Sequence, residues 1–173
     1  MDLASKLKGI KLVAMDVDGV LTEGQIIYGS DGMELKCFNA RDGHGIKLLQ
    51  RAGLKSAIIT GRQSEAVLRR AEELGISCLI QNSKNKVEAL NEIIRTTALL
   101  EHEIAYIGDD LVDIPVMRRV GVAVAPCDGH DLAKQYASII TNLPGGRGAV
   151  REFIEILLQA QSKWEELISK YIN

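Results

Sequence analysis

The chain has 173 residues, 46% of them hydrophobic, and its 21 Lys and Arg against 23 Asp and Glu give a net charge of −2. This length and apolar content predict a single folded domain over residues 1–173 and exclude wholesale disorder. The nearly neutral charge, without long runs of one sign, excludes a nucleic-acid or membrane partner selected by bulk charge.

Short apolar runs rich in Ile, Val and Ala alternate with helical patterns along the chain. In chain order we expect strands over 11–17, 55–60, 77–81, 104–108, 121–125 and 137–141. Helices are expected between them, over 42–52, 63–74, 84–100, 114–120 and 131–136. A hairpin over about 23–39 follows the first strand, and a helical tail over about 148–173 ends the pattern. Continuous apolar runs bounded by Gly, Asp, Asn or Pro are typical of parallel strands buried on both faces. The alternation predicts an α/β fold with a Rossmann-like, doubly wound parallel sheet.

The hairpin is the only insertion that the pattern predicts near the start of the sheet. Its two strand-like runs flank the segment GSDG, whose Gly and Asp residues suit a tight turn. About 40 residues separate Asp18 from Thr60, and 25 separate Thr60 from Lys86. Since the hairpin, two helices and a strand fill these gaps, we expect no cap domain.

The remaining composition favours a cytoplasmic protein. The amino terminus lacks a long apolar segment followed by a cleavage site, and no apolar run approaches the roughly 18 residues that cross a bilayer. Cys37, Cys78 and Cys127 have neither disulfide-framework nor metal-finger spacing, which is typical of reduced thiols.

Polar side chains follow four of the predicted strands. They are Asp16 and Asp18, then Thr60, Gly61 and Arg62, then Lys84 and Lys86, and then Asp109, Asp110 and Asp113. Ligands of open α/β sheets bind at the carboxyl ends of the strands, so these groups should converge on one cleft. Several carboxylates there would repel each other unless a cation lies among them, and oxygen ligands alone suit Mg²⁺.

The neutral and basic groups complete a phosphate site. The Thr60 hydroxyl, the Gly61 amide and a lysine, Lys86 in preference to Lys84, would hold an anion with several oxygens. Metal, acids and an anion site together indicate phosphoryl transfer. Asp16 could attack phosphorus as a nucleophile, and Asp18 could then protonate the leaving oxygen and activate water.

The motifs DVDGVLT, TGR, Lys86 and GDDLVD, in this order, resemble those of the haloacid dehalogenase superfamily. The segments FNARDGHGI and LPGGRGAVRE and the short hairpin resemble those of the 3-deoxy-D-manno-octulosonate 8-phosphate phosphatases. These enzymes form a cap-less branch of the superfamily and act in lipopolysaccharide biosynthesis. A receiver domain also uses acids, Thr and Lys around Mg²⁺, but no lone Asp ends the second or third strand here.

This resemblance implies specific roles for the residues. Asp16 would be the nucleophile and Asp18 the acid/base, while Thr60 and Lys86 would bind phosphate. The ligands of Mg²⁺ would be Asp16, the Asp18 backbone carbonyl and Asp109, with Asp113 behind them. The resemblance also implies a homotetramer assembled through the hairpin, and we expect a neighbouring subunit to close the cleft.

Four residues are candidates for reading the sugar. Arg62 could bind its carboxylate in a bidentate manner or form a surface ion pair. Arg41, His44 and Arg147 could face the substrate or stay solvated. Two acids have a second interpretation as well: Asp42 could face the substrate or cap its own helix, and Asp110 could join the acid cluster or cap the next helix.

Three functions remain open on the sequence alone. The first is a Mg²⁺-dependent phosphatase of 3-deoxy-D-manno-octulosonate 8-phosphate. The second is a phosphatase of a nine-carbon sugar-acid 9-phosphate or a broad phosphatase of small phosphates. The third is a non-catalytic oligomerisation module, which is disfavoured because Asp16, Asp18 and Asp109 are all present.

Overall fold

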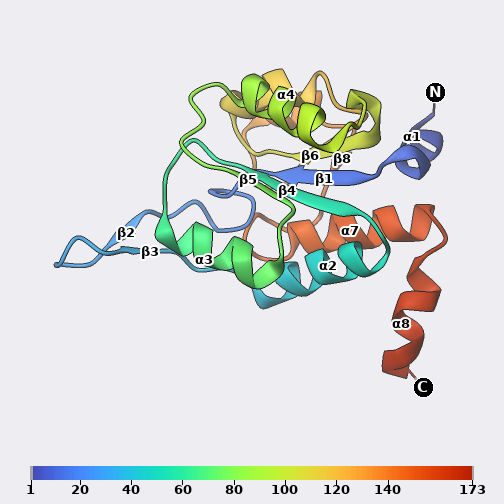
Figure 1. Ribbon diagram of the computed structural model, residues 1–173, viewed down its shortest axis with the longest axis horizontal. Coiled ribbons are helices and arrows are strands. Elements are labelled where there is room, and N and C mark those ends of the chain that lie inside the picture. Colours follow the sequence, from blue (N-terminus) through green and yellow to red (C-terminus); the bar gives the residue numbers. More distant parts are fainter. Residues whose placement is uncertain (1, 173) are drawn as a thin grey trace.

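A six-stranded parallel sheet forms the centre of the protein, of which the computed structural model describes residues 2–172 (Figure 1). Its order is β5-β4-β1-β6-β7-β8. The strands are β1 (Leu12–Met15), β4 (Lys55–Ile59), β5 (Cys78–Ile80), β6 (Ile104–Ile107), β7 (Val122–Ala125) and β8 (Ile139–Ile140). The predicted doubly wound α/β fold is thereby confirmed, with each strand one to three residues shorter than expected at one end or both.

Alternation along β1 shows why the sheet needs a helical layer on each face. Val13 and Met15 pack into one apolar cluster, and Leu12 and Ala14 pack into the other. All four side chains are fully buried, because successive side chains of a strand point to opposite faces. The strand is paired on both edges, with Leu12 opposite Lys55 of β4 and Ile104 of β6. Its carboxyl end therefore lies beside those of its neighbours.

Helices cover both faces of this sheet (Figure 1). One layer holds α1 (Leu3–Gly9), α2 (Ala40–Arg51), α3 (Glu65–Leu74) and α7 (Ala149–Ala160), and the other holds α4 (Lys86–Thr97), α5 (Ile114–Met117) and α6 (Asp131–Tyr136). Short 3₁₀ turns, η1 (Glu101–Glu103) and η2 (Leu111–Asp113), flank β6. No helix in the described part of the chain has the length and apolar character to cross a bilayer.

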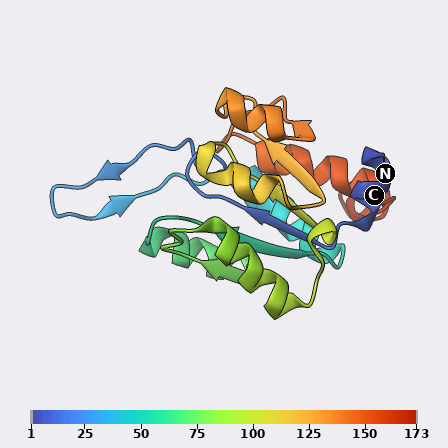
Figure 2. The same ribbon diagram turned by 90° about the horizontal axis from the view of Figure 1, so that it is seen from above.

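The predicted hairpin is present and projects well beyond the sheet (Figures 1 and 2). Its strands, β2 (Ile27–Tyr28) and β3 (Glu34–Leu35), are antiparallel, with Tyr28 opposite Glu34. Large apolar side chains on it are exposed: Ile26, Ile27, Tyr28, Met33 and Leu35. The hairpin thus leaves an apolar surface uncovered in this single chain.

The helical termini differ from the expectation in two ways. The carboxyl-terminal tail is two helices, since the chain turns at Ser162 (φ 56°) between α7 and α8 (Trp164–Ile172). The amino-terminal helix α1 was not predicted. Its start is capped by the Asp2 carboxylate, which accepts a hydrogen bond from the Ser5 amide at 2.7 Å.

Asp42 neither caps its own helix nor faces the predicted phosphate site. Asn39 caps α2, and its side chain accepts from the Arg41 amide. Asp42 is buried and accepts from the amides of Gly148 (3.2 Å) and Arg151 (2.8 Å). It therefore caps α7 and fastens that helix to α2, which corrects both interpretations made from the sequence.

Candidate active site

The groups that follow β1, β4, β5 and β6 converge on one pocket of about 520 Å³. Its lining includes Asp16, Asp18, Thr60, Gly61, Arg62, Ser83, Lys84, Asn85, Lys86, Asp109 and Asp110. Parallel pairing brings these strand ends to the same edge of the sheet, as the sequence predicted.

Asp16 is the first residue after β1, and its amide still donates to the Ile107 carbonyl at 3.0 Å. The Oδ1 atom of its buried carboxylate accepts from the Val17 amide at 2.7 Å. The Oδ2 atom lies 2.6 Å from the Lys86 ammonium. Each carboxylate oxygen has roughly two acceptor sites, so one on each atom remains for a ligand or a reacting group.

Lys86 begins α4, where Asn85 caps the helix by accepting from the Val87 amide at 3.1 Å. Its ammonium bridges Asp16 and Asp113, at 2.6 Å from each. Burial lowers the pKa of Lys86, but these two carboxylates more than offset burial and raise it overall. Lys86 therefore stays charged, whereas the Lys84 side chain remains exposed at the rim of the pocket.

Asp113 organises the loop that carries the other acids. It is fully buried and accepts from the Tyr106 hydroxyl at 2.6 Å as well as from Lys86. Its Oδ2 atom also accepts from the amides of Asp109 and Asp110, both at 3.1 Å. These four donors occupy its oxygens and leave little capacity for a metal. Asp110 caps the η2 turn through the Leu111 amide, which favours its interpretation as a cap.

The Asp109 carboxylate packs against the backbone of the loop that follows β1. Gly19, at φ +86°, lies so close that a Cβ there would be 2.1 Å from Asp109 Oδ2. Burial and, after it, the charges of the neighbouring Asp113 and Asp16 raise the pKa of Asp109 to about 7. Burial likewise raises the pKa of Asp16 to about 6, although Lys86 lowers it.

These carboxylates fit a hard divalent cation. Asp16, Asp109 and Asp113 each offer one oxygen, and the three atoms lie within 4.8 Å of one another. Within residues 2–172, no hydrogen bond satisfies the Asp109 carboxylate, so its oxygens are free to act as ligands. Because Asp113 is already saturated by protein donors, Asp16 and Asp109 are the better ligands. Clustered oxygen donors of this kind suit Mg²⁺.

Other residues that line the pocket suit a phosphoryl group. The buried Thr60 hydroxyl oxygen accepts from the Arg62 amide at 3.3 Å, which leaves its O–H free to donate. The Ser83 amide donates to the Thr60 carbonyl at 3.0 Å and fixes this turn beside the start of α4. Gly61 is exposed between them. The Thr60 hydroxyl, Gly61 and Lys86 thus line the same pocket as the carboxylates.

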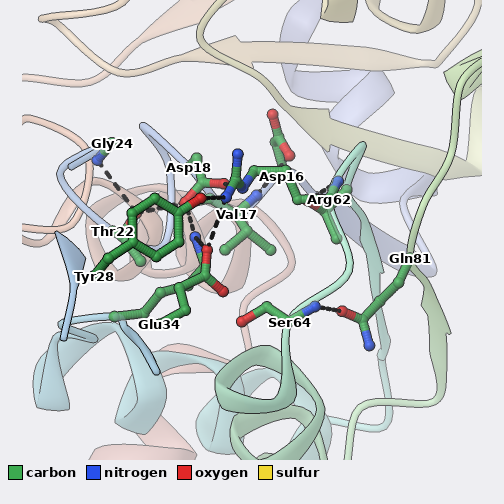
Figure 3. Close-up of polar contacts among 12 residues, drawn as sticks. Asp16, Val17, Asp18, Thr22, Gly24, Tyr28, Glu34, Arg62, Ser64 and Gln81 are labelled. Carbon is green, nitrogen blue, oxygen red and sulfur yellow. Dashed lines mark hydrogen bonds and ion pairs between the residues drawn. The ribbon is translucent and has the colours of Figure 1, made fainter. Parts of the chain in front are cut away.

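Asp18 lines the pocket and lies beside Arg62 and the hairpin residues Tyr28 and Glu34 (Figure 3). Its side chain is 22% exposed and contacts the Lys36 ammonium. Arg62 lines the pocket, but its guanidinium also donates to Glu34 and to the Tyr28 hydroxyl, both at 3.0 Å. Sequence reasoning missed Glu34 and Lys36. The available signal was their i, i+2 spacing in a strand, which puts both on one face.

Three predicted substrate contacts lie outside this pocket in the single chain. Arg41 lines a separate groove beside α7. His44 contacts Tyr171 and Arg151, each at 3.0 Å. Arg147 is exposed and pairs with Glu23 at 2.7 Å. The structure therefore brings Asp16, Asp18, Thr60, Gly61, Arg62, Lys86 and Asp109 together, with Asp113 directly behind, but not these three.

Comparison with known proteins agrees with this arrangement. Residues 41–121 match the haloacid dehalogenase-like hydrolase family. The 3-deoxy-D-manno-octulosonate 8-phosphate phosphatase of Escherichia coli K12 is 45% identical over 95% of this chain and 88% of its own.

Two solved structures extend this similarity to the fold. The enzyme of that name from Moraxella catarrhalis, in complex with magnesium ion, phosphate ion and a KDO molecule, is 43% identical, with 97% of each chain covered and a TM-score of 0.95. The one from Yersinia pestis is 44% identical, covers 94% of this chain and 88% of its own, and has a TM-score of 0.92. The chain belongs to the haloacid dehalogenase-like hydrolases and, among them, to the 3-deoxy-D-manno-octulosonate 8-phosphate phosphatases.

Proposed function

We propose that this protein is a Mg²⁺-dependent phosphatase that hydrolyses 3-deoxy-D-manno-octulosonate 8-phosphate to the free sugar acid and phosphate. The observation that carries the proposal is the Lys86 ammonium, held between Asp16 and Asp113, in the pocket that Thr60 and Asp109 also line. It agrees with the magnesium, phosphate and KDO bound by the relative from Moraxella catarrhalis.

Asp16 acts as the nucleophile in the first step. Its carboxylate attacks phosphorus, and the bond to the sugar oxygen breaks while Asp18 donates a proton to that oxygen. Lys86, the Thr60 hydroxyl and the Gly61 amide hold the phosphoryl oxygens during the transfer. Lys86 also fixes the orientation of Asp16 through the 2.6 Å contact.

In the second step water hydrolyses the aspartyl-phosphate, with Asp18 as the base. Asp18 takes a proton from a water molecule, whose oxygen attacks the aspartyl-phosphate and frees Asp16. The residues that would hold Mg²⁺ are Asp16, Asp109 and the backbone carbonyl of Asp18, with Asp113 fixing the loop behind. When bound, the ion offsets the charge of the carboxylates and of the phosphoryl oxygens.

We further propose a single domain over residues 1–173 that works as a cytoplasmic homotetramer. The exposed apolar side chains of the hairpin, which include Tyr28 and Met33, support assembly through that element. A neighbouring subunit would close the entrance and exclude water, which strengthens charge interactions inside. In that assembly Arg41, His44 or Arg147 could reach a neighbouring pocket.

The test is phosphate release with Mg²⁺ from the octulosonate 8-phosphate, a nine-carbon sugar-acid 9-phosphate, hexose phosphates and a nucleotide. A preference of a hundredfold in kcat/KM for the octulosonate, about 2.7 kcal/mol, would establish the substrate. An equal profile would indicate a broad phosphatase. No release from any compound would revive the non-catalytic module.

A further inference from the structure

The base of the hairpin places a buried lysine against Asp18. The Lys36 side chain is only 1% exposed, and its ammonium contacts Asp18 Oδ1 and lies 3.7 Å from Glu34 Oε1. Lysine is almost never fully buried without a partner, since an unpaired ammonium loses its hydration. The position of Lys36 therefore depends on these two carboxylates, one of which belongs to the proposed catalytic pair.

Arg62 completes a balanced set of four charges. Its Nη2 atom donates to Glu34 Oε1 at 3.0 Å and its Nε atom lies 3.9 Å from Asp18 Oδ2 (Figure 3). That Nε atom is buried and has no hydrogen-bond partner among the described residues. Two cations and two carboxylates thus connect the hairpin to the pocket, and Asp18 is the only one of the four in the proposed proton transfer.

The two oxygens of Asp18 have different surroundings. Oδ1 contacts Lys36 and lies 3.4 Å from the Thr22 hydroxyl. Oδ2 accepts no hydrogen bond from any residue within 2–172, and the one ion pair that it forms among these residues is with Arg62, at 3.9 Å. One oxygen is therefore held by the protein, while the other is available to carry a proton.

We propose that Lys36 is a positioning residue for catalysis: it holds Asp18 through Oδ1, so that Oδ2 exchanges the protons of the reaction. This inference rests on the proposed function, in which Asp18 is the acid/base. In the first step the Asp16–phosphorus bond forms, the bond from phosphorus to the sugar oxygen breaks, and the proton on Oδ2 moves to that oxygen. In the second step a water proton moves to Oδ2 as the water oxygen replaces Asp16 on phosphorus.

A purely structural role for Lys36 makes a different prediction. If Lys36 only fastened the hairpin, its loss would slow all substrates alike. If it aligns the acid, the loss must depend on the leaving group, because a sugar alkoxide needs a proton and 4-nitrophenolate does not. The ratio kcat/KM reports this first step, since it includes events up to departure of the leaving group.

The experiment compares Lys36→Met with the wild-type chain on two substrates, a sugar phosphate that the wild type hydrolyses and 4-nitrophenyl phosphate. We expect kcat/KM to fall roughly 10- to 100-fold for the sugar phosphate, part of the ~10²–10⁴-fold that acid–base groups supply. For the aryl phosphate we expect a loss of less than about threefold, because its leaving group requires no acid. Lys11→Met is the matched control, since Lys11 pairs with Glu103 and precedes β1 at the opposite end of the strand from Asp16.

A second comparison places Lys36→Met in an Asp18→Asn background. If Lys36 acts through Asp18, the double variant should be no slower on the sugar phosphate than Asp18→Asn alone. Multiplied losses in the double variant, or equal losses on both substrates in the single variant, would overturn the inference.

Two further outcomes, a variant that does not fold and a wild type that prefers another substrate, are distinguished from a failure of the inference. If Lys36→Met does not fold, Lys36→Arg, which keeps the charge but changes its reach, is compared on the same two substrates, and an equal loss or no loss overturns the inference. If the wild type prefers another sugar phosphate, the proposed substrate is wrong, while the leaving-group comparison with that compound still decides the role of Lys36. A wild type that is inactive on every phosphate overturns both.

Discussion

Gly19 and Asp109 are in such close contact that any side chain at position 19 would have to displace the Asp109 carboxylate. A Cβ atom built on Gly19 would lie 2.1 Å from Asp109 Oδ2, and the backbone there has a φ of +86°. We predict that Gly19→Ala displaces the Asp109 carboxylate, weakens Mg²⁺ binding and lowers kcat/KM by at least about tenfold, which corresponds to ~1.4 kcal/mol. Mg²⁺ titrations followed by activity would measure this.

The control for this prediction is Gly9→Ala at the end of α1. Apart from its chain neighbours and its own helix backbone, no atom lies within 4 Å of a Cβ built there, and Gly9 precedes the amino end of β1, whereas Asp16 follows its carboxyl end. Full Mg²⁺ affinity in Gly19→Ala would contradict the role given to Asp109.

Lys86 compensates two buried carboxylates, so its replacement should affect both stability and catalysis. In Lys86→Met, Asp16 and Asp113 would face each other in a buried site without the ammonium that now lies 2.6 Å from each. Removing one partner of a buried ion pair costs about 3–5 kcal/mol. We expect a lower free energy of unfolding without Mg²⁺ and a loss of turnover with it.

Denaturant unfolding and phosphate release would measure the two effects of Lys86→Met. Lys55→Met, at the exposed start of β4, is the control, and it should change neither quantity much. Unchanged stability together with normal turnover in Lys86→Met would contradict the phosphate-site assignment.

The sheet and the place of the pocket could be predicted because both depend on local pattern. Runs such as residues 104–107 are buried on both faces, and their continuous apolar composition predicts this burial. Asp16 and Asp109 follow neighbouring parallel strands, so their convergence requires only the topology.

Other features depend on contacts between distant segments, which spacing does not disclose. Asp42 caps a helix more than 100 residues away. Lys36 reaches Asp18 only because the second strand of the hairpin returns the chain to the place where the first one left it. The backbone amides of its own helix were plausible local partners for Asp42, but tertiary packing gave it those of α7 instead. The break at Ser162 was equally hidden, since the apolar stripe continues on both sides of it.

The buried cap at Asp42 makes a prediction on stability. Asp42→Ala would leave the amides of Gly148 and Arg151 without their acceptor. An unsatisfied buried donor costs about 1–3 kcal/mol, so we expect a loss of roughly 2–4 kcal/mol for the pair with partial rescue by water. Urea unfolding measures it. The exposed Asp131, in the first turn of α6, is the control, and Asp131→Ala should cost far less.

The contacts of His44 lead us to predict that the packing of α8 against the rest of the chain depends on pH. Its Nδ1 atom lies 3.0 Å from Arg151 Nη1, which can only donate, so Nδ1 accepts and the ring is neutral. Nε2–H then donates to the Tyr171 hydroxyl at 3.0 Å. Partial burial lowers the pKa of His44 below 6.5, and the charges of Arg151, Arg51 and Lys170 lower it further.

The direction of the effect follows from this lowered pKa. The unfolded chain binds the proton more readily than the native one, so this contribution to stability is complete above pH 6.5 and is lost as the pH falls through the native pKa. We therefore expect the melting temperature of the wild type to decrease more than that of His44→Gln between pH 7.5 and about pH 5. Parallel profiles for the two proteins would rule out His44 as the source.

Magnesium should stabilise the fold through the acid cluster, independently of turnover. Burial raises the pKa of Asp16 to about 6, and burial together with the charges of Asp113 and Asp16 raises that of Asp109 to about 7, so a cation bound between the two carboxylates would favour their charged forms. A ligand of the native state alone adds about 2.7 kcal/mol at a concentration of 100 Kd, so the melting temperature should increase with Mg²⁺ concentration. In Asp109→Asn the increase should be much smaller, although the amide matches the carboxylate in size. EDTA should abolish phosphate release and excess Mg²⁺ should restore it, whereas activity that survives exhaustive chelation would contradict the cation site altogether.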